Sequence, residues 1–322
     1  MAVKSLLSIL ADGELHSGQE IADILDISRT AVWKQLQGLE ACGLQVERIR
    51  GRGYRLDRPL DLLDEGRLAS VLPRERRAQL SLDLQPIVAS TNDRIMAAPF
   101  GCRRFSACLA EQQTAGRGRR GRSWISPFGQ NLYLSLGFRL RRGWAGIEGL
   151  SLVAGLAVVD ALANLGVEKG VALKWPNDIW LNDRKLAGIL IELKGEAQSE
   201  CNVVLGLGLN VYMEARNVTG IDQPWTSLAR EGVVPEGGKN RLAATLLDNL
   251  MDKAEQFDRE GFGVFRARWA HYDALADRPV TILDTGERGF GRGVDERGAY
   301  LVEMPEGLRA CTSGEVSVRA HG

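Results

Sequence analysis

The sequence has 322 residues, enough for two or three domains, and its 44% hydrophobic and 25% charged residues are typical of a globular rather than a disordered protein. With 41 basic and 41 acidic residues the formal net charge is zero, so nucleic-acid binding would have to depend on local patches. Five scattered cysteines with no Cys-x-x-Cys pair, and only three histidines, argue against a disulfide framework and a zinc site. The first residues lack a full signal-peptide core and no apolar run reaches the length of a membrane span, so we expect a cytoplasmic protein with no membrane partner.

The first 60 or so residues indicate a small helical unit that ends in a hairpin. Ser17 can cap one helix and Ser28 the next, and residues 48–56 alternate and turn at glycine like the wing of a winged helix-turn-helix. The outer side of the second of these helices and the wing carry side chains suited to bases and phosphates, and we expect these to bind DNA: Ser28, Arg29, Thr30, Trp33, Lys34, Arg50 and Arg52. A helical protein-interaction module with a basic hairpin is the alternative.

Residues 57–85 are expected to form a polar connector with short helices, with a domain boundary near Pro59. The charge run at residues 74–77 is typical of a solvated face. From Ile87 onward, apolar strands alternate with helices. Ser90, Thr91 and Asn92 lie at the start of a helix, where they can cap it and also offer hydroxyl and amide groups to a ligand.

A glycine-arginine loop at residues 116–122 joins the strands expected at 107–113 and 131–138. Four guanidinium groups on a loop with three glycines favour an anionic ligand. The loop matches G-x-G-x-x-G, but a proline and a glycine follow instead of a helix, so the dinucleotide-binding interpretation lacks its context. It also lacks the Gly-Lys-Ser/Thr ending of a Walker A loop. A solvated basic loop without a ligand is the alternative.

Two further stretches place polar groups beside apolar strands. Residues 174–178, Lys-Trp-Pro-Asn-Asp, follow the strand 171–173, and the proline fixes a rigid corner. Lys185 begins the apolar strand 185–192, which contains Gly188, and we expect its ammonium to face a buried anion. The strand 201–211 is again rich in glycine, which suggests a cavity shared by these segments.

The remaining segments complete the predicted fold. Helices are expected at 150–165, 241–257 and 262–272, and short strands at 280–283, 300–302 and 315–318 indicate a small β-barrel. A pocket formed by the three polar stretches would suit an apolar acid together with a polyphosphate.

At this point the sequence resembles bacterial bifunctional biotin protein ligases that are also biotin-operon repressors. Five stretches carry the resemblance: 90–92, 111–124, 174–178, 184–190 and 206–211. The carboxy-terminal Gly314-Glu315-Val316-Ser317 with Arg319 also matches the family's ending. The resemblance implies a winged helix-turn-helix at 1–62, an α/β mixed-sheet ligase domain of the class II synthetase and biotin-lipoate ligase type at 63–275, and an SH3-like barrel at 276–322.

The resemblance also implies a two-step reaction. Biotin and ATP, with Mg²⁺, give biotinyl-5'-AMP, and biotin then passes to a lysine of the biotin carboxyl carrier protein of acetyl-CoA carboxylase. The adenylate-bound protein is expected to form a homodimer that binds operator DNA. A regulator that only senses a small acid, or a lipoate-type ligase, would use many of the same features.

The site residues that the resemblance implies fall into four groups. The catalytic residues are Lys185, Arg119, Lys174 and Asp178, with Asp178 also a metal ligand. Those that hold biotin are Ser90, Thr91, Asn92, Gln113, Arg117, Gly118, Arg119, Lys185 and Gly188. Those that hold ATP or the adenylate are Arg122, Trp124, Asn177, Asn210, Trp225 and Arg319.

Overall fold

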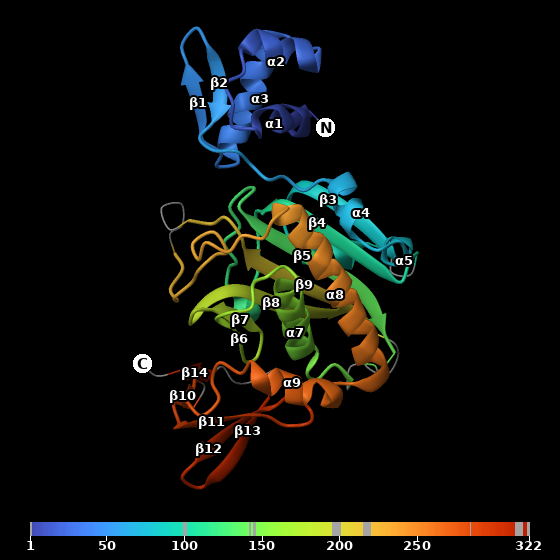
Figure 1. Cartoon of the computed structure of the whole chain (residues 1–322), viewed down its shortest axis with the longest axis vertical. Helices are drawn as coiled ribbons and strands as arrows, with labels where there is room; N and C mark the ends of the chain where they lie inside the picture. The colour runs from blue at the N-terminus through green and yellow to red at the C-terminus, as the bar shows by residue number, and fades with distance from the viewer. Residues whose placement is uncertain are drawn as a thin grey trace.

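A computed structural model describes residues 2–98, 102–141, 143, 146–194, 201–214, 220–283, 285–312 and 318–320. Three units follow one another along the longest axis (Figure 1). A small helical unit with a hairpin lies at one end, a sheet covered by helices lies in the middle, and a second, smaller sheet lies at the other end.

The amino-terminal unit is the predicted winged helix-turn-helix. Its helices are α1 (Ala2–Leu10), α2 (Gly18–Leu25) and α3 (Arg29–Ala41), and its wing is the antiparallel pair β1 (Val46–Ile49) and β2 (Gly53–Leu56). The capping box of Ser17 and Glu20 is present at α2, and the Ser28 hydroxyl accepts the Ala31 amide at α3. A separate apolar cluster holds the unit together, and Phe128 from the central unit joins it.

The connector differs from the prediction at its carboxy-terminal end. Helices α4 (Glu65–Val71) and α5 (Arg74–Gln79) form as expected, but β3 (Leu80–Val88) is an edge strand parallel to the next strand of the central sheet. The charge run is also not wholly solvated. The Arg76 side chain is 16% exposed because it forms ion pairs with Asp248, Asp252 and Glu255.

The central sheet has seven strands and is mixed, as expected. Its other strands are β4 (Phe105–Gln113), β5 (Asn131–Leu140), β6 (Val171–Lys174), β7 (Asp178–Leu181), β8 (Arg184–Lys194) and β9 (Cys201–Asn210). The order is β3-β4-β5-β9-β8-β7-β6, with β3 parallel to β4 and the remaining pairs antiparallel.

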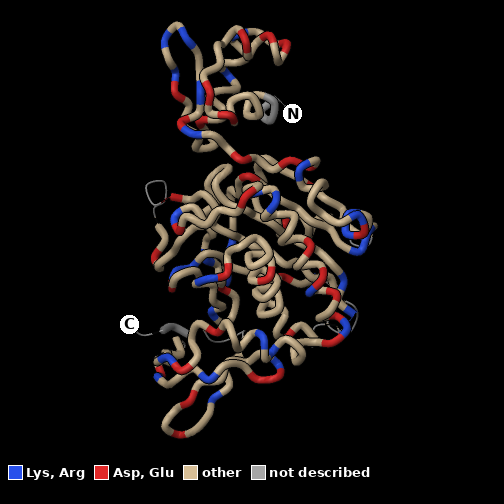
Figure 2. The backbone as a smooth tube through the Cα atoms, viewed as in Figure 1, with Lys and Arg blue, Asp and Glu red and all other residues tan. Residues whose placement is uncertain are grey.

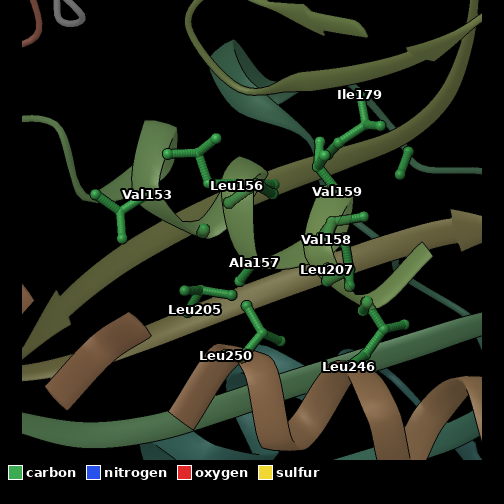
Figure 3. Packing of buried hydrophobic residues seen from close by; sticks show 14 of the residues in the cluster. Val153, Leu156, Ala157, Val158, Val159, Ile179, Leu205, Leu207, Leu246 and Leu250 are labelled. Carbon is green, nitrogen blue, oxygen red and sulfur yellow. The ribbon is translucent and has the colours of Figure 1, made fainter. Parts of the chain in front are cut away.

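The side chains of β9 alternate between the two faces of the central sheet. Leu205 and Leu207 face α7 (Leu150–Ala163) and α8 (Gly238–Glu260), which pack on that side of the sheet (Figure 3). Gly206 and Gly208 alternate with these leucines and so face the opposite side. On that side α6 (Thr91–Ala97) packs through Ile95 against Cys108 and Val204. One face is therefore packed core and the other is left open for a ligand.

The carboxy-terminal part contains α9 (Arg266–His271), after a 3-10 turn at Gly263–Phe265, and an antiparallel sheet. Its strands are β10 (Pro279–Ile282), β11 (Arg288–Val294), β12 (Tyr300–Met304), β13 (Gly307–Cys311) and β14 (Val318–Ala320). Their order is β13-β12-β11-β10-β14, and β11 and β13 were not predicted from the sequence. Its apolar residues belong to the same cluster as those of the central unit. No helix in the described ranges is long and apolar enough to cross a membrane.

Candidate active site

A cavity of about 130 Å³ lies on the open face of the central sheet. All three polar stretches predicted from the sequence meet there, together with the start of α6. Residues predicted as site residues that line it are Ser90, Thr91, Asn92, Gln113, Arg117, Gly118, Arg119, Arg122, Trp124, Lys174, Asn177, Asp178, Lys185 and Gly188.

The glycine-arginine loop forms a tight, internally bonded turn. The Gly118 amide donates to the Arg122 carbonyl at 2.7 Å, and the Trp124 amide donates to the Gly116 carbonyl at 2.8 Å. A Cβ at Gly116 would lie 2.6 Å from the Trp124 carbonyl oxygen, so only glycine fits there. A single 3-10 turn at Arg119–Gly121 replaces the helix that a dinucleotide-binding motif would need. The loop thus lines the cavity as a turn and is not followed by the helix of a Rossmann dinucleotide-binding motif.

Arg117 is held by carboxylates. Its guanidinium donates to both oxygens of Asp93, at 2.7 and 2.6 Å, and to Glu192 at 3.2 Å. The Asp93 hydrogen bond raises the pKa of Arg117, and the same bond lowers the pKa of Asp93. Asp93 lies in the first turn of α6, whose cap is Ser90. Arg117 therefore ties the arginine loop to the segment that was predicted to hold the acid.

Arg119 turns toward the catalytic corner. Its Nη1 donates to the Asn177 Oδ1 at 3.3 Å. Burial, with the positive charge of Arg120, lowers its pKa, and the nearby Asp178 carboxylate acts in the opposite direction. A partly desolvated guanidinium between other cations is energetically costly, and an anion in the cavity would relieve that cost.

The corner at residues 174–178 and the start of β8 form a second cationic group. The Lys185 ammonium lies 2.8 Å from the Asp178 Oδ1, and the two side chains are only 15% and 13% exposed. Lys185 also lies over the Trp124 ring at 5.4 Å, and Lys174 lies over the Trp180 ring at 4.9 Å. The sequence predicted that Lys185 faces a buried anion, and in this structure that anion is the Asp178 carboxylate.

Glycines form the floor of the cavity. Gly188 and Gly208 lie opposite each other on β8 and β9, and the Trp124 ring covers both. A Cβ at Gly208 would lie 2.4 Å from the Trp124 Cε2, so the contact requires glycine. The indole nitrogen of Trp124 is buried and has no hydrogen-bond partner among the described residues. An unsatisfied buried donor costs about 1–3 kcal/mol, which makes it a donor available to a ligand.

A polar network lines the wall beside α6. The Gln113 side-chain oxygen accepts from the amide of Thr91 at 2.9 Å and from its hydroxyl at 3.1 Å. Ser135 on β5 donates toward Asn92, and the Asn92 Nδ2 donates to Glu192 at 2.6 Å. Because these groups hold one another in fixed rotamers, they are preorganised hydrogen-bonding groups.

An adjoining cavity of about 340 Å³ shares Arg122, Trp124 and Lys185 with the first. Asn210 and Trp225 line it, as predicted for the nucleotide side. The segment that carries Trp225 runs beside the start of β8, because the Thr226 amide donates to the Lys185 carbonyl at 2.9 Å.

A third cavity of about 600 Å³ lies where the central unit meets the carboxy-terminal sheet. Arg119 and Asn177 line both this cavity and the first, so the two adjoin at these residues. The backbone of Arg319 lies in β14. The Gly314–Ser317 part of the family ending lies outside the described residues.

Several residues that contact or line the site were not predicted from the sequence. Asp93 and Glu192 hold Arg117, and Ser135 contacts the polar wall. Gly206 was noted only as part of a glycine-rich strand, although a Cβ there would lie 2.4 Å from the Asn92 Oδ1. The available signal was alternation. Ser135 on β5 is paired with Gly206 on the adjacent strand β9, and paired residues lie on the same face of a sheet. A site residue on β9 therefore identifies its neighbour on β5.

The residues predicted to bind DNA lie on the surface of the winged unit. All seven are exposed, and Trp33 is 44% exposed even though it is a large apolar residue. Within the described residues, Arg50 and Arg52 form no ion pair, whereas Arg48 and Arg55 beside them pair with Glu40 and Glu47. Arg50 and Arg52 lie in the turn between β1 and β2, and Figure 2 shows basic residues on that hairpin.

Comparison with known proteins places these features in a family. Residues 103–210 match the biotin/lipoate A/B protein ligase family, and residues 3–55 match a helix-turn-helix domain. The chain is 42% identical to the bifunctional ligase/repressor BirA of Salmonella typhimurium, over 98% of this chain and 97% of that protein. It is 34% identical to the biotin--[acetyl-CoA-carboxylase] ligase of Paracoccus denitrificans, over 70% of this chain and 96% of that protein.

A solved structure agrees. The biotin protein ligase of Aquifex aeolicus, in complex with biotin and ATP, superposes with a TM-score of 0.63 at 28% identity, covering 75% of this chain and 99% of that one. The fold, the site and the 42% identity over nearly the full chain lead to one conclusion: the chain belongs to the family of bifunctional biotin protein ligases and repressors.

Proposed function

We propose that this protein is an ATP-dependent biotin protein ligase that makes biotinyl-5'-AMP, transfers biotin to a lysine of the biotin carboxyl carrier protein, and represses transcription from an operator. The observation that carries the proposal is the meeting of the arginine loop, the residue 174–178 corner and Lys185 over one glycine-floored cavity. Cations around an apolar floor match an apolar carboxylate beside a phosphate ester. Because the reaction uses ATP and the repressor needs DNA, the protein would act in the cytoplasm.

Biotin would lie on the glycine floor. The preorganised groups of Ser90, Thr91, Asn92 and Gln113 would hydrogen-bond the polar end of the ligand, since the two amides and two hydroxyls supply both donors and acceptors. The carboxylate would then point toward Lys185 and the arginine loop. Remaining members of this predicted group are Arg117, Gly118, Arg119 and Gly188, which line the same cavity.

The nucleotide would occupy the adjoining cavity. Arg122, Trp124, Asn210 and Trp225 line it, and the buried indole N–H of Trp124 is a donor without a protein partner among the described residues. The α-phosphate would lie where the two cavities meet, which is where Lys185 lies. This arrangement would bring a biotin carboxylate oxygen close to the phosphorus that it attacks.

The chemistry has two steps. In the first, a biotin carboxylate oxygen bonds to the α-phosphorus of ATP, and the bond to the bridging oxygen of pyrophosphate breaks. In the second, the carrier lysine amine bonds to the acyl carbon, AMP leaves with the former carboxylate oxygen, and the amine proton passes to solvent. Lys185, Arg119 and Lys174 would stabilise the negative charge that builds on phosphoryl and carbonyl oxygens in a water-poor site.

A magnesium ion fits this arrangement. Among the described residues that line the central cavity, Asp178 is the one carboxylate, and no group of three or more metal-binding side chains occurs in the described ranges. Mg²⁺ is commonly held by one or two carboxylates together with substrate phosphates, so Asp178 would be its protein ligand. The ion would neutralise phosphate charge, and Lys185 would turn from Asp178 to the substrate.

The carrier lysine would approach through the third cavity, which adjoins the first at Arg119 and Asn177. The same face offers a surface for a second copy. β7 pairs with β8 only as far as Gly188, and within the described residues no strand pairs with residues 190–194 on that side. An open strand edge can pair with another chain. Carrier and second copy would then compete, so repression would follow when unmodified carrier is scarce.

The operator would bind the winged unit. Helix α3 would enter the major groove with Arg29, Thr30, Trp33 and Lys34, while Ser28 caps it and Arg50 and Arg52 contact phosphates. The domain boundaries at 62 and 275 belong to the same proposal. At the first of them the packing changes, because Leu62 contacts the amino-terminal cluster and Leu63 belongs to the central one.

The decisive experiment is biotin-dependent exchange of labelled pyrophosphate into ATP. We expect exchange with biotin but not with lipoate or octanoate, and a loss of at least about a hundredfold in Lys185→Ala. Lys194→Ala is the matched control, because Lys194 is on the same strand but exposed and outside the cavities. Exchange with lipoate alone would indicate a lipoate-type ligase. Absence of exchange with every acid would leave a regulator that only senses a small acid.

The dimer is tested separately, by sedimentation of the protein with biotin and ATP. We expect a shift from monomer to dimer that requires both substrates, and Leu193→Pro, which removes an amide donor from the open edge, should abolish it. A monomer at all ligand concentrations would contradict the proposed interface.

A further inference from the structure

The catalytic corner is anchored to the carboxy-terminal sheet by contacts that the proposed reaction does not use. Trp175, within the corner, is 1% exposed and does not donate toward the cavity. Its indole nitrogen donates to the Gly298 carbonyl at 3.0 Å, across 123 positions of sequence. The residues on either side of Trp175 line the cavity, so this bond connects the cavity wall with the distant sheet.

The Tyr300 ring packs against the Trp175 indole. Its ring lies 5.7 Å from the Trp175 ring and 6.5 Å from the Trp269 ring, and it is fully buried. Its hydroxyl donates to the Asp273 carboxylate at 3.1 Å, and the Leu275 amide donates to the other oxygen of that carboxylate at 2.9 Å. Three aromatic rings and one carboxylate therefore hold a single arrangement.

The strand that enters the corner is fixed by the same segment. β6 is an edge strand of the central sheet, yet the Leu173 amide donates to the Tyr272 carbonyl at 2.7 Å and the Ala274 amide donates to the Leu173 carbonyl at 2.9 Å. Asp273, which receives the Tyr300 hydroxyl, lies between these two residues. The corner is thus held from its open edge as well as from β7.

The turn that presents the Gly298 carbonyl is rigid. Gly298 has φ +89°, and a Cβ there would lie 3.0 Å from the Gly149 Cα at the start of α7. The Asp295 carboxylate accepts the amides of Arg297 and Ala299, both at 2.9 Å. The acceptor for Trp175 is therefore fixed relative to the helix whose Ser151 donates to the Pro176 carbonyl at 2.9 Å.

We propose that Trp175 and Tyr300 are positioning residues, through which the carboxy-terminal sheet holds Lys174, Asn177 and Asp178 in the geometry for adenylate formation. This rests on the proposed ligase function. The sheet would then act on the activation step through the position of the corner. A misplacement of about 1 Å at the reacting groups can cost about a hundredfold in rate, so a small loosening of the corner is enough for a measurable effect.

The test uses Trp175→Phe, which removes the N–H donor and keeps an aromatic ring, and Tyr300→Phe, which removes only the hydroxyl. Ile282→Ala is the control, because Ile282 is buried in β10 of the same sheet and makes none of these bonds. We expect kcat for pyrophosphate exchange to fall about tenfold in both phenylalanine variants, with KM for biotin changed less than twofold. Ile282→Ala should lower Tm while keeping kcat, measured well below its Tm.

A second readout does not depend on activity. Amide hydrogen exchange of the peptide covering residues 172–180 should rise in Trp175→Phe and Tyr300→Phe and stay at the native level in Ile282→Ala. If the native protein shows no pyrophosphate exchange, the ligase proposal fails while this readout still decides the positioning. Two results would overturn the inference. One is that both phenylalanine variants keep the native kcat and the native protection against amide hydrogen exchange. The other is that Ile282→Ala loses as much kcat as they do.

Discussion

Lys239 is a fully buried charge outside the site, and its removal is a test of how the units are joined. It lies at the start of α8 and is 0% exposed, and its ammonium bonds to the Glu111 carboxylate on β4, which is also buried. Glu111 in turn accepts the Leu63 amide from the connector, and Asp61 accepts the Lys239 amide and the Tyr212 hydroxyl. One ion pair therefore fastens the connector, the sheet and the helix.

Lys239→Met keeps the apolar stem and leaves Glu111 as a buried carboxylate without its cation. Breaking a buried pair in this way costs about 3–5 kcal/mol. At about 2 °C per kcal/mol for a chain of this size, Tm should fall by about 6–10 °C. Thermal melting followed by circular dichroism measures it. Lys169→Met, at an exposed lysine without a hydrogen bond or ion pair among the described residues, should shift Tm by less than about 1 °C.

The double variant Lys239→Met with Glu111→Gln separates charge from packing. Glutamine keeps an acceptor for the Leu63 amide and removes the unpaired charge, so it should recover more than half of the lost Tm. If the single variant melts within about 2 °C of the native protein, or the double variant is no better than the single one, the ion pair does not join the units as reasoned.

Three further outcomes are expected. Gly208→Ala would place a Cβ 2.4 Å from the Trp124 ring and displace that ring, which also lines the proposed nucleotide cavity. KM for ATP in pyrophosphate exchange should therefore rise at least about tenfold, and an unchanged KM would refute the tight contact. Burial raises the pKa of Asp273 from 3.8 to about 6. Between these two values the folded carboxyl keeps a proton that the unfolded chain has released, so the free energy of unfolding should fall by about 1–3 kcal/mol as pH rises from about 4 to about 6. Asp273→Asn should remove that fall in Tm against pH, and a native slope in the variant would assign it to other groups. Arg50→Ala should weaken operator binding uniformly and lower the salt dependence of log K by about one unit, whereas a change confined to one base position would contradict a phosphate contact.

Local patterns along the chain were sufficient to predict most of the elements. The caps at Ser17 and Ser28, the wing around Gly51 and the strands that carry Lys185 and Gly208 are each set by neighbours within a few residues, and they form where expected. The edge strand at 80–88 was missed although Leu80, Leu82 and Leu84 alternate, because its polar alternate positions resemble a connector. An edge strand is defined by the partner it pairs with, and the partner begins at Phe105, 25 positions later.

The sequence by itself determined which residues could bind an anion. Arginine on a glycine-rich loop, lysine at the head of an apolar strand and glycine at alternate positions together favour an anion site, because guanidinium and ammonium groups bind anions and glycine allows a close approach. The tertiary structure decided how those charges are shared. Arg117 is held by Asp93 and Glu192, Lys185 is held by Asp178, and the Trp175 indole N–H donates to the Gly298 carbonyl. Such partners come from segments far apart in the chain, and only chain packing brings them within hydrogen-bonding distance.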